Sequence, residues 1–330
     1  MPSRTVRRLA KSQWDAAMEA ARKVFPPDNP YGVFAFGIGE RRRKGRPVGG
    51  PTLQVLVERK HRSPDASVPA VRFRHLRKTF EVVPDIVATS RRPQPGQAMG
   101  HPEFSGLHPG AAIQVRGRWW GAAGYLACDT RADGNSPTHL ITAGHLFPPA
   151  ADEEPVVAGM HGLEPQIIGT LAANLLDWNP SPPLFPMDAA AVELNQAGQT
   201  MARACAAVVQ LGGLPTENLL GIDAQAFLAT SQDFSPVTRT DNRPFDFPAM
   251  QSSARGTYSV RTVLRTTSAI TLDGDSGTVL TSYDDRRSAM GLCIGTVGTA
   301  MSLFEPAFRA CKYLSRLLHL ELQLWPQTDS

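Results

Sequence analysis

The 330-residue sequence contains no long apolar run. A membrane-spanning helix needs about 18 or more consecutive apolar residues, and no such stretch occurs. The first 23 residues carry scattered charges and lack the apolar core of about 7–15 residues that defines a secretory signal. We therefore expect a cytoplasmic protein that does not bind a membrane.

Cysteine is also scarce, with four residues at wide spacings. No Cys-x-x-Cys motif and no Cys/His cluster occurs, so no metal site is expected. No other motif calls for an organic cofactor, so we expect none. In a reducing compartment the four side chains are expected to be buried free thiols. They are Cys128, Cys205, Cys293 and Cys311.

Charge is unevenly distributed along the chain, although the formal net charge is only +4. Residues 1–100 carry 20 Lys and Arg against 8 Asp and Glu, whereas residues 101–330 carry 14 against 22. A basic N-terminal part is thus joined to an acidic remainder. Two interpretations are open, because the basic part could bind the acidic part or an acidic partner such as nucleic acid.

Residues 1–102 are predicted to form a small basic α+β module that ends in a linker. An amphipathic helix is predicted over 11–25, because apolar side chains recur there at steps of three and four residues. The first two of four predicted strands form a hairpin around a long basic loop, and a Pro/Gly-rich linker covers 89–102. The predicted strands are 32–39, 52–58, 69–75 and 80–88.

Residues 103–330 have the pattern of a mainly-β domain. Short apolar runs alternate with turn signals from about residue 110 onward, as in a barrel. The run at 202–209 is included among these predicted strands, whereas 221–256 shows no clear pattern. A final helix is predicted over 306–322, with Pro306 at its start.

A candidate nucleophile lies in the tetrapeptide Gly274-Asp275-Ser276-Gly277. A reactive serine needs a turn that exposes its hydroxyl and main-chain N–H groups that converge where a carbonyl oxygen becomes negative. Glycine at 274 permits such a turn, because it has no side chain to obstruct it. The predicted oxyanion-hole donors are the N–H groups of Gly274 and Ser276.

A serine hydroxyl also needs a base and a carboxylate that orients the base. His145 follows the apolar run 139–141 and is therefore placed at a strand end. Asp188 precedes the small apolar run 189–192, which suits a buried carboxylate. Asp177 is the competing carboxylate, but no such strand follows it.

The three motifs TAGH, MDAAAV and GDSG, in the order His–Asp–Ser, resemble the chymotrypsin/trypsin-like serine protease family. The resemblance implies a mainly-β chymotrypsin-like double β-barrel with a C-terminal helix, over 103–330. It also implies a serine endopeptidase that acts on protein or peptide substrates with His145, Asp188 and Ser276. The part before it is similar, more weakly, to plant narrow-leaf-type and related bacterial trypsin-like proteins.

The sequence departs from the family pattern at several positions. Gly144 replaces the usual alanine and Thr278 the usual glycine. No activating terminus of the digestive kind is present, so Asp275 must be satisfied in another way. By family analogy the substrate pocket is lined by residues that favour an apolar or small side chain. They are Ile270 at its base and Ile294, Gly295 and Thr296 in its wall.

Two further interpretations compete with an active protease. The first is a latent or inactive scaffold that keeps the fold and binds a partner. The second is a nucleic-acid-binding module centred on the basic run 41–46, although aromatic residues are sparse there and no RNA-binding signature occurs. A related hypothesis is that residues 1–102, or an acidic partner bound to them, regulate the protease.

Overall fold

The computed structural model describes residues 4–43, 46–58, 68–89, 106–115, 119–132, 136–150, 154–158, 164–178, 186–215, 219–272 and 274–326. The chain forms two compact units. Unit 1 consists of Met1–Arg92, Asn242–Met250 and Tyr258–Val263, and unit 2 of Pro93–Asp241, Gln251–Thr257 and Leu264–Ser330. Two short segments from the middle of the sequence therefore complete the N-terminal unit. The linker predicted over 89–102 lies, except for its first residue, outside the described residues.

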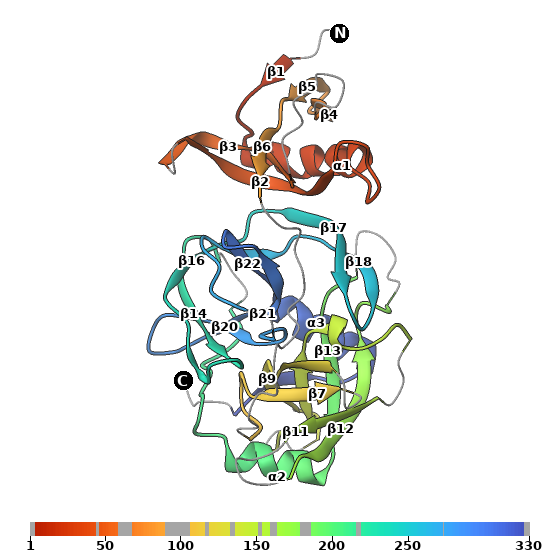
Figure 1. Cartoon of the computed structure of the whole chain (residues 1–330), viewed down its shortest axis with the longest axis vertical. Helices are drawn as coiled ribbons and strands as arrows, with labels where there is room; N and C mark the ends of the chain where they lie inside the picture. The colour runs from red at the N-terminus through yellow and green to blue at the C-terminus, as the bar shows by residue number, and fades with distance from the viewer. Residues whose placement is uncertain are drawn as a thin grey trace. The chain divides into compact units, whose positions relative to one another are not determined.

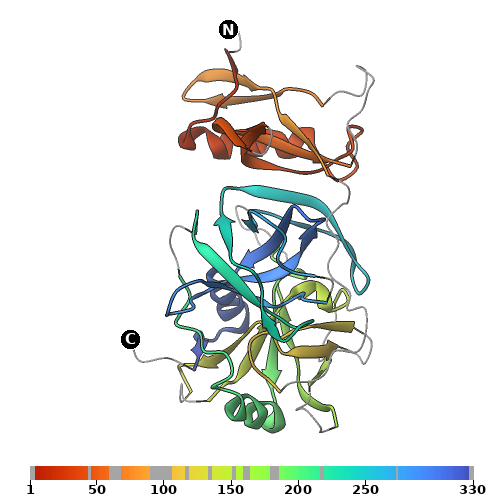
Figure 2. The same ribbon diagram turned by 60° about the vertical axis from the view of Figure 1, so that its left-hand side comes forward.

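Unit 1 is built from one helix and two small sheets (Figure 1, Figure 2). The predicted helix is confirmed as α1 (Trp14–Val24), which follows a 3₁₀ turn and packs Ala17, Met18 and Ala21 into the unit's core. One sheet has the order β1-β5-β4 and the other β18-β17-β2-β3-β6. The strands of the two sheets are β1 (Arg4–Val6), β2 (Val33–Arg43), β3 (Arg46–Val57), β4 (Val71–His75), β5 (Lys78–Val82), β6 (Asp85–Ala88), β17 (Phe245–Ser252) and β18 (Gly256–Val260). The adjoining ends of β17 and β18, within Gln251–Thr257, belong to unit 2.

Two predictions for unit 1 need correction. The hairpin β2–β3 has no long charged loop, because both strands continue into the basic stretch and their pairing reaches Arg43 and Arg46. Main-chain pairing is indifferent to charge where side chains can reach water, so the basic residues do not end the strands. The strand predicted over 80–88 is two strands, since Pro84 has no N–H to donate and separates β5 from β6.

Unit 2 is mainly β and has the chymotrypsin-like double β-barrel architecture that the sequence predicts, with one closed six-stranded barrel and one half-barrel. The first sheet has the order β23-β9-β10-β13-β12-β11-β7-β8. Its strands are β7 (Ala112–Val115), β8 (Trp119–Ala122), β9 (Tyr125–Asp129), β10 (His139–Thr142), β11 (Pro155–Ala158), β12 (Gln166–Asn174), β13 (Ala190–Leu194) and β23 (Leu322–Trp325). Its inward side chains, among them Ile113, Leu140 and Val192, form one apolar core.

The second sheet has the order β15-β14-β16-β19-β22-β21-β20, and an additional pairing joins β14 to β20. Its strands are β14 (Asp223–Leu228), β15 (Asp233–Phe234), β16 (Thr238–Asp241), β19 (Leu264–Thr266), β20 (Val279–Ser282), β21 (Ala289–Val297) and β22 (Met301–Pro306). A separate apolar cluster, with Ile141 from β10 and Leu292 from β21, lies between the two sheets. This cluster fixes the ends of β10 and β20 relative to each other.

Two helices cover unit 2 (Figure 1). The strand predicted over 202–209 is wrong: α2 (Gln196–Ala204), which Asn195 caps by accepting the N–H of Gly198, covers 202–204, and a turn and a bend follow over 205–209. α3 (Ala307–Leu318) confirms the predicted C-terminal helix but ends earlier, at the left-handed residue His319, and β23 follows. Within the described part of the chain, no helix is long and apolar enough to cross a bilayer. All four cysteines are buried free thiols, as predicted.

Candidate functional site

The register of two neighbouring strands brings His145 and Asp188 together. Thr142, at the end of β10, is paired with Ala190, at the start of β13. His145 lies three residues after Thr142, in the 3₁₀ turn η3 (Gly144–Leu146), and Asp188 lies two residues before Ala190. Antiparallel pairing therefore places both residues at the same edge of the sheet.

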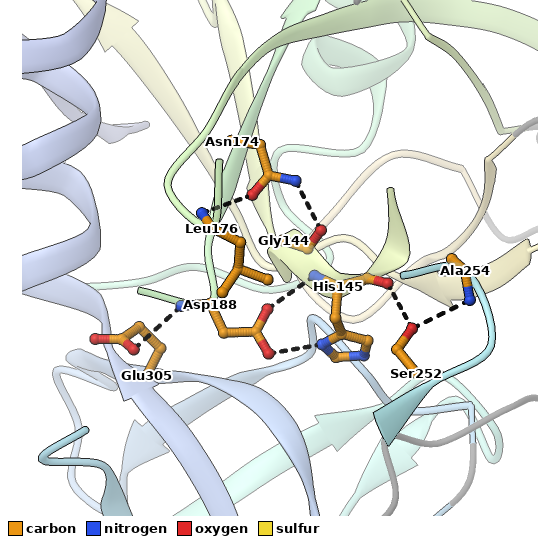
Figure 3. A network of polar contacts seen from close by, with 8 residues as sticks. All are labelled: Gly144, His145, Asn174, Leu176, Asp188, Ser252, Ala254 and Glu305. Atoms are coloured by element: carbon orange, nitrogen blue, oxygen red, sulfur yellow. Dashed lines mark hydrogen bonds and ion pairs between the residues drawn. The ribbon is translucent and has the colours of Figure 1, made fainter. Parts of the chain in front are cut away.

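Asp188 contacts His145 through both carboxylate oxygens (Figure 3). Oδ1 accepts the main-chain N–H of His145 at 2.9 Å, and Oδ2 lies 2.8 Å from the ring atom Nδ1. The side chains are only 2% and 0% exposed. A carboxylate held in this way fixes the ring orientation and the tautomer with a proton on Nδ1, so that Nε2 faces away from Asp188 as the potential base.

The turn that carries Ser276 lies against the ends of β8 and β10. Ser276 O accepts the N–H of Ala122 at 2.7 Å, and Ala122 O accepts the hydroxyl of Thr142 at 2.7 Å. Gly277 has φ of +96°, and a Cβ there would lie 2.3 Å from Ala122 O and Thr142 Oγ1. Only glycine permits this approach. The predicted nucleophile thus neighbours Thr142, on the same segment as His145.

Asp275 is satisfied within the chain. Its Oδ1 accepts the N–H and the hydroxyl of Thr230, at 3.0 and 3.1 Å, and its Oδ2 accepts the N–H of Leu272 at 2.8 Å. Burial raises the pKa of this carboxyl, while the hydrogen bonds oppose that shift. Thr278 has a structural role that explains the threonine at this position. Its hydroxyl donates to Phe227 O and ties the Ser276 turn to β14.

Two further polar residues hold the His145 turn (Figure 3). Asn174 donates from Nδ2 to Gly144 O at 2.8 Å and accepts the N–H of Leu176. Ser252, at the end of β17, donates its hydroxyl to His145 O at 2.8 Å. The main-chain carbonyls of Gly144 and His145 both accept a hydrogen bond from these side chains, which limits movement of the imidazole.

Asp177, the competing carboxylate, has a different role. It accepts two hydrogen bonds from the Arg255 guanidinium, at 2.6 and 2.8 Å. The Arg255 side chain is only 6% exposed, whereas Asp177 is 31% exposed. Its ion pair with Arg255 joins the turn after β12 to the β17–β18 hairpin.

Asn174 also explains why glycine stands at position 144. A Cβ at Gly144 would lie 2.5 Å from Asn174 Oδ1 and 3.1 Å from Ala189 N. Asn174 cannot move aside without losing its hydrogen bonds to Gly144 O and Leu176 N. Asn174 therefore leaves no room for a side chain at position 144, and glycine is required there.

This packing predicts a non-additive pair of substitutions. Gly144→Ala is expected to lower the free energy of unfolding by about 1–3 kcal/mol, as overpacking does. In an Asn174→Ala background the same change should cost about 1 kcal/mol less, since the clash with Asn174 Oδ1 is gone. Denaturant unfolding of the two single variants and the double variant measures this coupling. Gly50→Ala is the control, because the nearest atom there is 3.5 Å from a Cβ; additive effects would contradict the explanation.

The predicted pocket residues lie in or beside the second sheet. Ile270 is 7% exposed and packs into the cluster with Leu264 and Phe304, and its N–H donates to Ser302 Oγ at 2.9 Å. Ile294 is fully buried at a bulge of β21, next to Gly295, and Thr296 is half-buried on the same strand. Their roles in substrate binding stay a prediction.

Several residues around the His145 turn and the Ser276 turn cannot be recognised from the sequence alone. Asn174, Thr230 and Ser252 are single polar residues at strand ends or turns, and nothing local distinguishes them from surface residues. Glu305 is a further case: it lies in the buried strand β22, and its Oε2 accepts the N–H of Asp188 at 3.3 Å. A carboxylate within an otherwise apolar strand pattern is the one signal that could have marked it.

No protein-family model and no curated protein matches the chain. Solved structures of several proteases have a similar fold. A Nocardiopsis protease has 18% identity and a TM-score of 0.40, covering 68% of this chain and 100% of its own. A glutamic-acid-specific serine protease has 16% identity and a TM-score of 0.42, covering 66% of this chain and 100% of its own. A Yersinia pestis serine endoprotease has 13% identity and a TM-score of 0.39, covering 64% of each chain. These likenesses concern architecture alone.

Proposed function

We propose that the protein is a serine endopeptidase that uses Ser276, His145 and Asp188. The observation that carries this proposal is the buried pair of His145 and Asp188, held by two short contacts. The Ser276 turn adds support, because its main chain lies against Ala122 and Thr142, beside the segment that leads to His145. An oriented histidine beside the segment that carries a candidate serine is what nucleophilic catalysis by a serine requires.

The reaction follows from these positions. Ser276 Oγ attacks the carbonyl carbon of the substrate, and its proton passes to His145 Nε2. The N–H groups of Gly274 and Ser276 stabilise the negative oxygen of the tetrahedral intermediate. The C–N bond then breaks as Nε2 gives its proton to the leaving amine. Water attacks the acyl-enzyme by the same route, with His145 as base, and restores Ser276. This chemistry requires no metal or organic cofactor.

The uncut chain is expected to be active. The Asp275 carboxylate accepts hydrogen bonds from Thr230 and Leu272, so no newly cleaved terminus is needed to orient it. The turn that contains the oxyanion-hole donors is then fixed by the fold itself. Regulation by the N-terminal module or by an acidic partner, and a cytoplasmic location, stay predictions.

A fluorophosphonate probe tests the proposal directly. Purified full-length protein should be labelled, and mass spectrometry should locate the adduct on Ser276 and show an intact N-terminus. Ser276→Ala should abolish labelling, whereas Ser282→Ala, a control on the neighbouring strand β20, should leave Ser276 labelled. Cleavage of a peptide library would then show endopeptidase activity. Folded wild-type protein that never reacts would overturn the proposal and favour the latent scaffold.

A further inference from the structure

Glu305 is a buried carboxyl group that contacts the main chain of Asp188 (Figure 3). It lies near the end of β22 in the second sheet, and its side chain is 0% exposed. Its Oε2 accepts the main-chain N–H of Asp188, which lies just before β13 in the first sheet. One hydrogen bond therefore joins the two sheets at the residue that orients His145.

The surroundings of Glu305 satisfy it only in part. Oε1 has no hydrogen-bond partner among the described residues, and Nη2 of Arg309, one turn into α3, is 3.7 Å away. On the adjoining strand β21, Leu292 is paired with Glu305, and the next residue, Cys293, is a buried thiol. On β19, the Arg265 guanidinium is bound by Asp241. Arg309 and Asp188 are thus the charged groups that act on Glu305.

A purely structural role would not require an acid at this position. Glutamine could accept the same N–H without the cost of burying a charge, which is several kcal/mol for an incompletely paired carboxylate. Burial raises the pKa of Glu305 to about 7; Arg309 opposes this shift and the Asp188 charge adds to it. Both charge states of Glu305 are therefore populated near neutral pH.

We propose that Glu305 is a positioning residue whose charge state sets how strongly the Asp188–His145 pair holds a proton. The proposal rests on the proposed function, since it concerns the base of that reaction. Ionised Glu305 adds a second negative charge behind Asp188 and stabilises the imidazolium form of His145. Neutral Glu305 withdraws that charge and weakens this stabilisation. Because the stabilisation changes as Glu305 ionises, activity rises gradually with pH.

The pH dependence of kcat/KM tests this proposal in the full-length protein. In the wild type, kcat/KM should rise with pH on the acid side of the profile over a wider pH range than the ionisation of a single group allows. Glu305→Gln keeps an acceptor for the Asp188 N–H and removes the charge. Its acid limb should follow a single ionisation, and its kcat/KM should exceed that of the wild type by about two- to threefold near pH 7, where wild-type Glu305 is partly ionised, and approach the wild-type value at lower pH.

Glu193→Gln is the matched control, because Glu193 is an exposed carboxylate on β13. Its profile should coincide with that of the wild type. A Glu305→Gln profile that also coincides would overturn the inference, as would a wild-type limb that fits one ionisation; the second result does not depend on whether the variant folds. Absence of fluorophosphonate labelling in the wild type at every pH would instead overturn the proposed function itself.

Discussion

Replacing Asp188 by asparagine is expected to lower kcat by about 10³- to 10⁴-fold without unfolding the protein. Asp188 accepts two hydrogen bonds from His145, one from the main chain and one from the ring. Asparagine has a single acceptor oxygen, and its NH₂ group favours the imidazole tautomer with the proton on Nε2. His145 in that form cannot take the proton of Ser276. Single-turnover hydrolysis of an activated ester measures the loss.

Asp177→Asn is the control for this substitution, because Asp177 is the other carboxylate that the sequence offers for the same role. Its oxygen binds Arg255 in a partly exposed pair, and the amide oxygen of asparagine can still accept one of those hydrogen bonds. We expect kcat within about threefold of the wild type. Equal losses in the two variants would contradict the assignment of Asp188 and show that the surroundings of His145, not its tautomer, had been changed.

The sequence was sufficient to predict the His145–Asp188 pair because its determinants are local. Each residue adjoins a short apolar strand, and those two strands are neighbours in the sheet. The same logic separated Asp188 from Asp177, since only Asp188 precedes a buried strand of small residues. Alternating apolar runs and turns predicted that unit 2 is mainly β, whereas the double barrel was implied by the resemblance that the three motifs carry.

The residues around the pair were not predictable, because their contacts depend on long-range register. Glu305 is 117 residues from Asp188, and Ser252 is 107 residues from His145. Neither contact leaves a pattern in a window of 10–20 residues. The segment 221–256 was unassigned for a similar reason: β17 pairs with β2 of unit 1, so its partner lies in a remote part of the chain.

Replacing Asp275 by asparagine is expected to have the second largest effect, a loss of about 100-fold or more in kcat/KM. Asp275 is fully buried, and its two oxygens accept three N–H or O–H groups. The NH₂ group of asparagine would face one of these donors and leave it without an acceptor, at a cost of about 1–3 kcal/mol. The adjoining Ser276 would shift, and with it the N–H groups that stabilise the oxyanion.

Thr230→Val and Asp284→Asn separate this explanation from general damage to the fold. Thr230→Val removes only the hydroxyl donor to Asp275, so the loss should be about three- to tenfold. Asp284 also accepts several hydrogen bonds, from Ser282, Arg286 and Arg287, but in an exposed turn between β20 and β21. Asp284→Asn should leave kcat/KM within about twofold, as surface substitutions usually do. Wild-type protein that reacts with fluorophosphonate only after limited proteolysis would contradict the whole account. Asp275 would then require a new amino terminus, and its bonds to Thr230 and Leu272 would belong to a latent form.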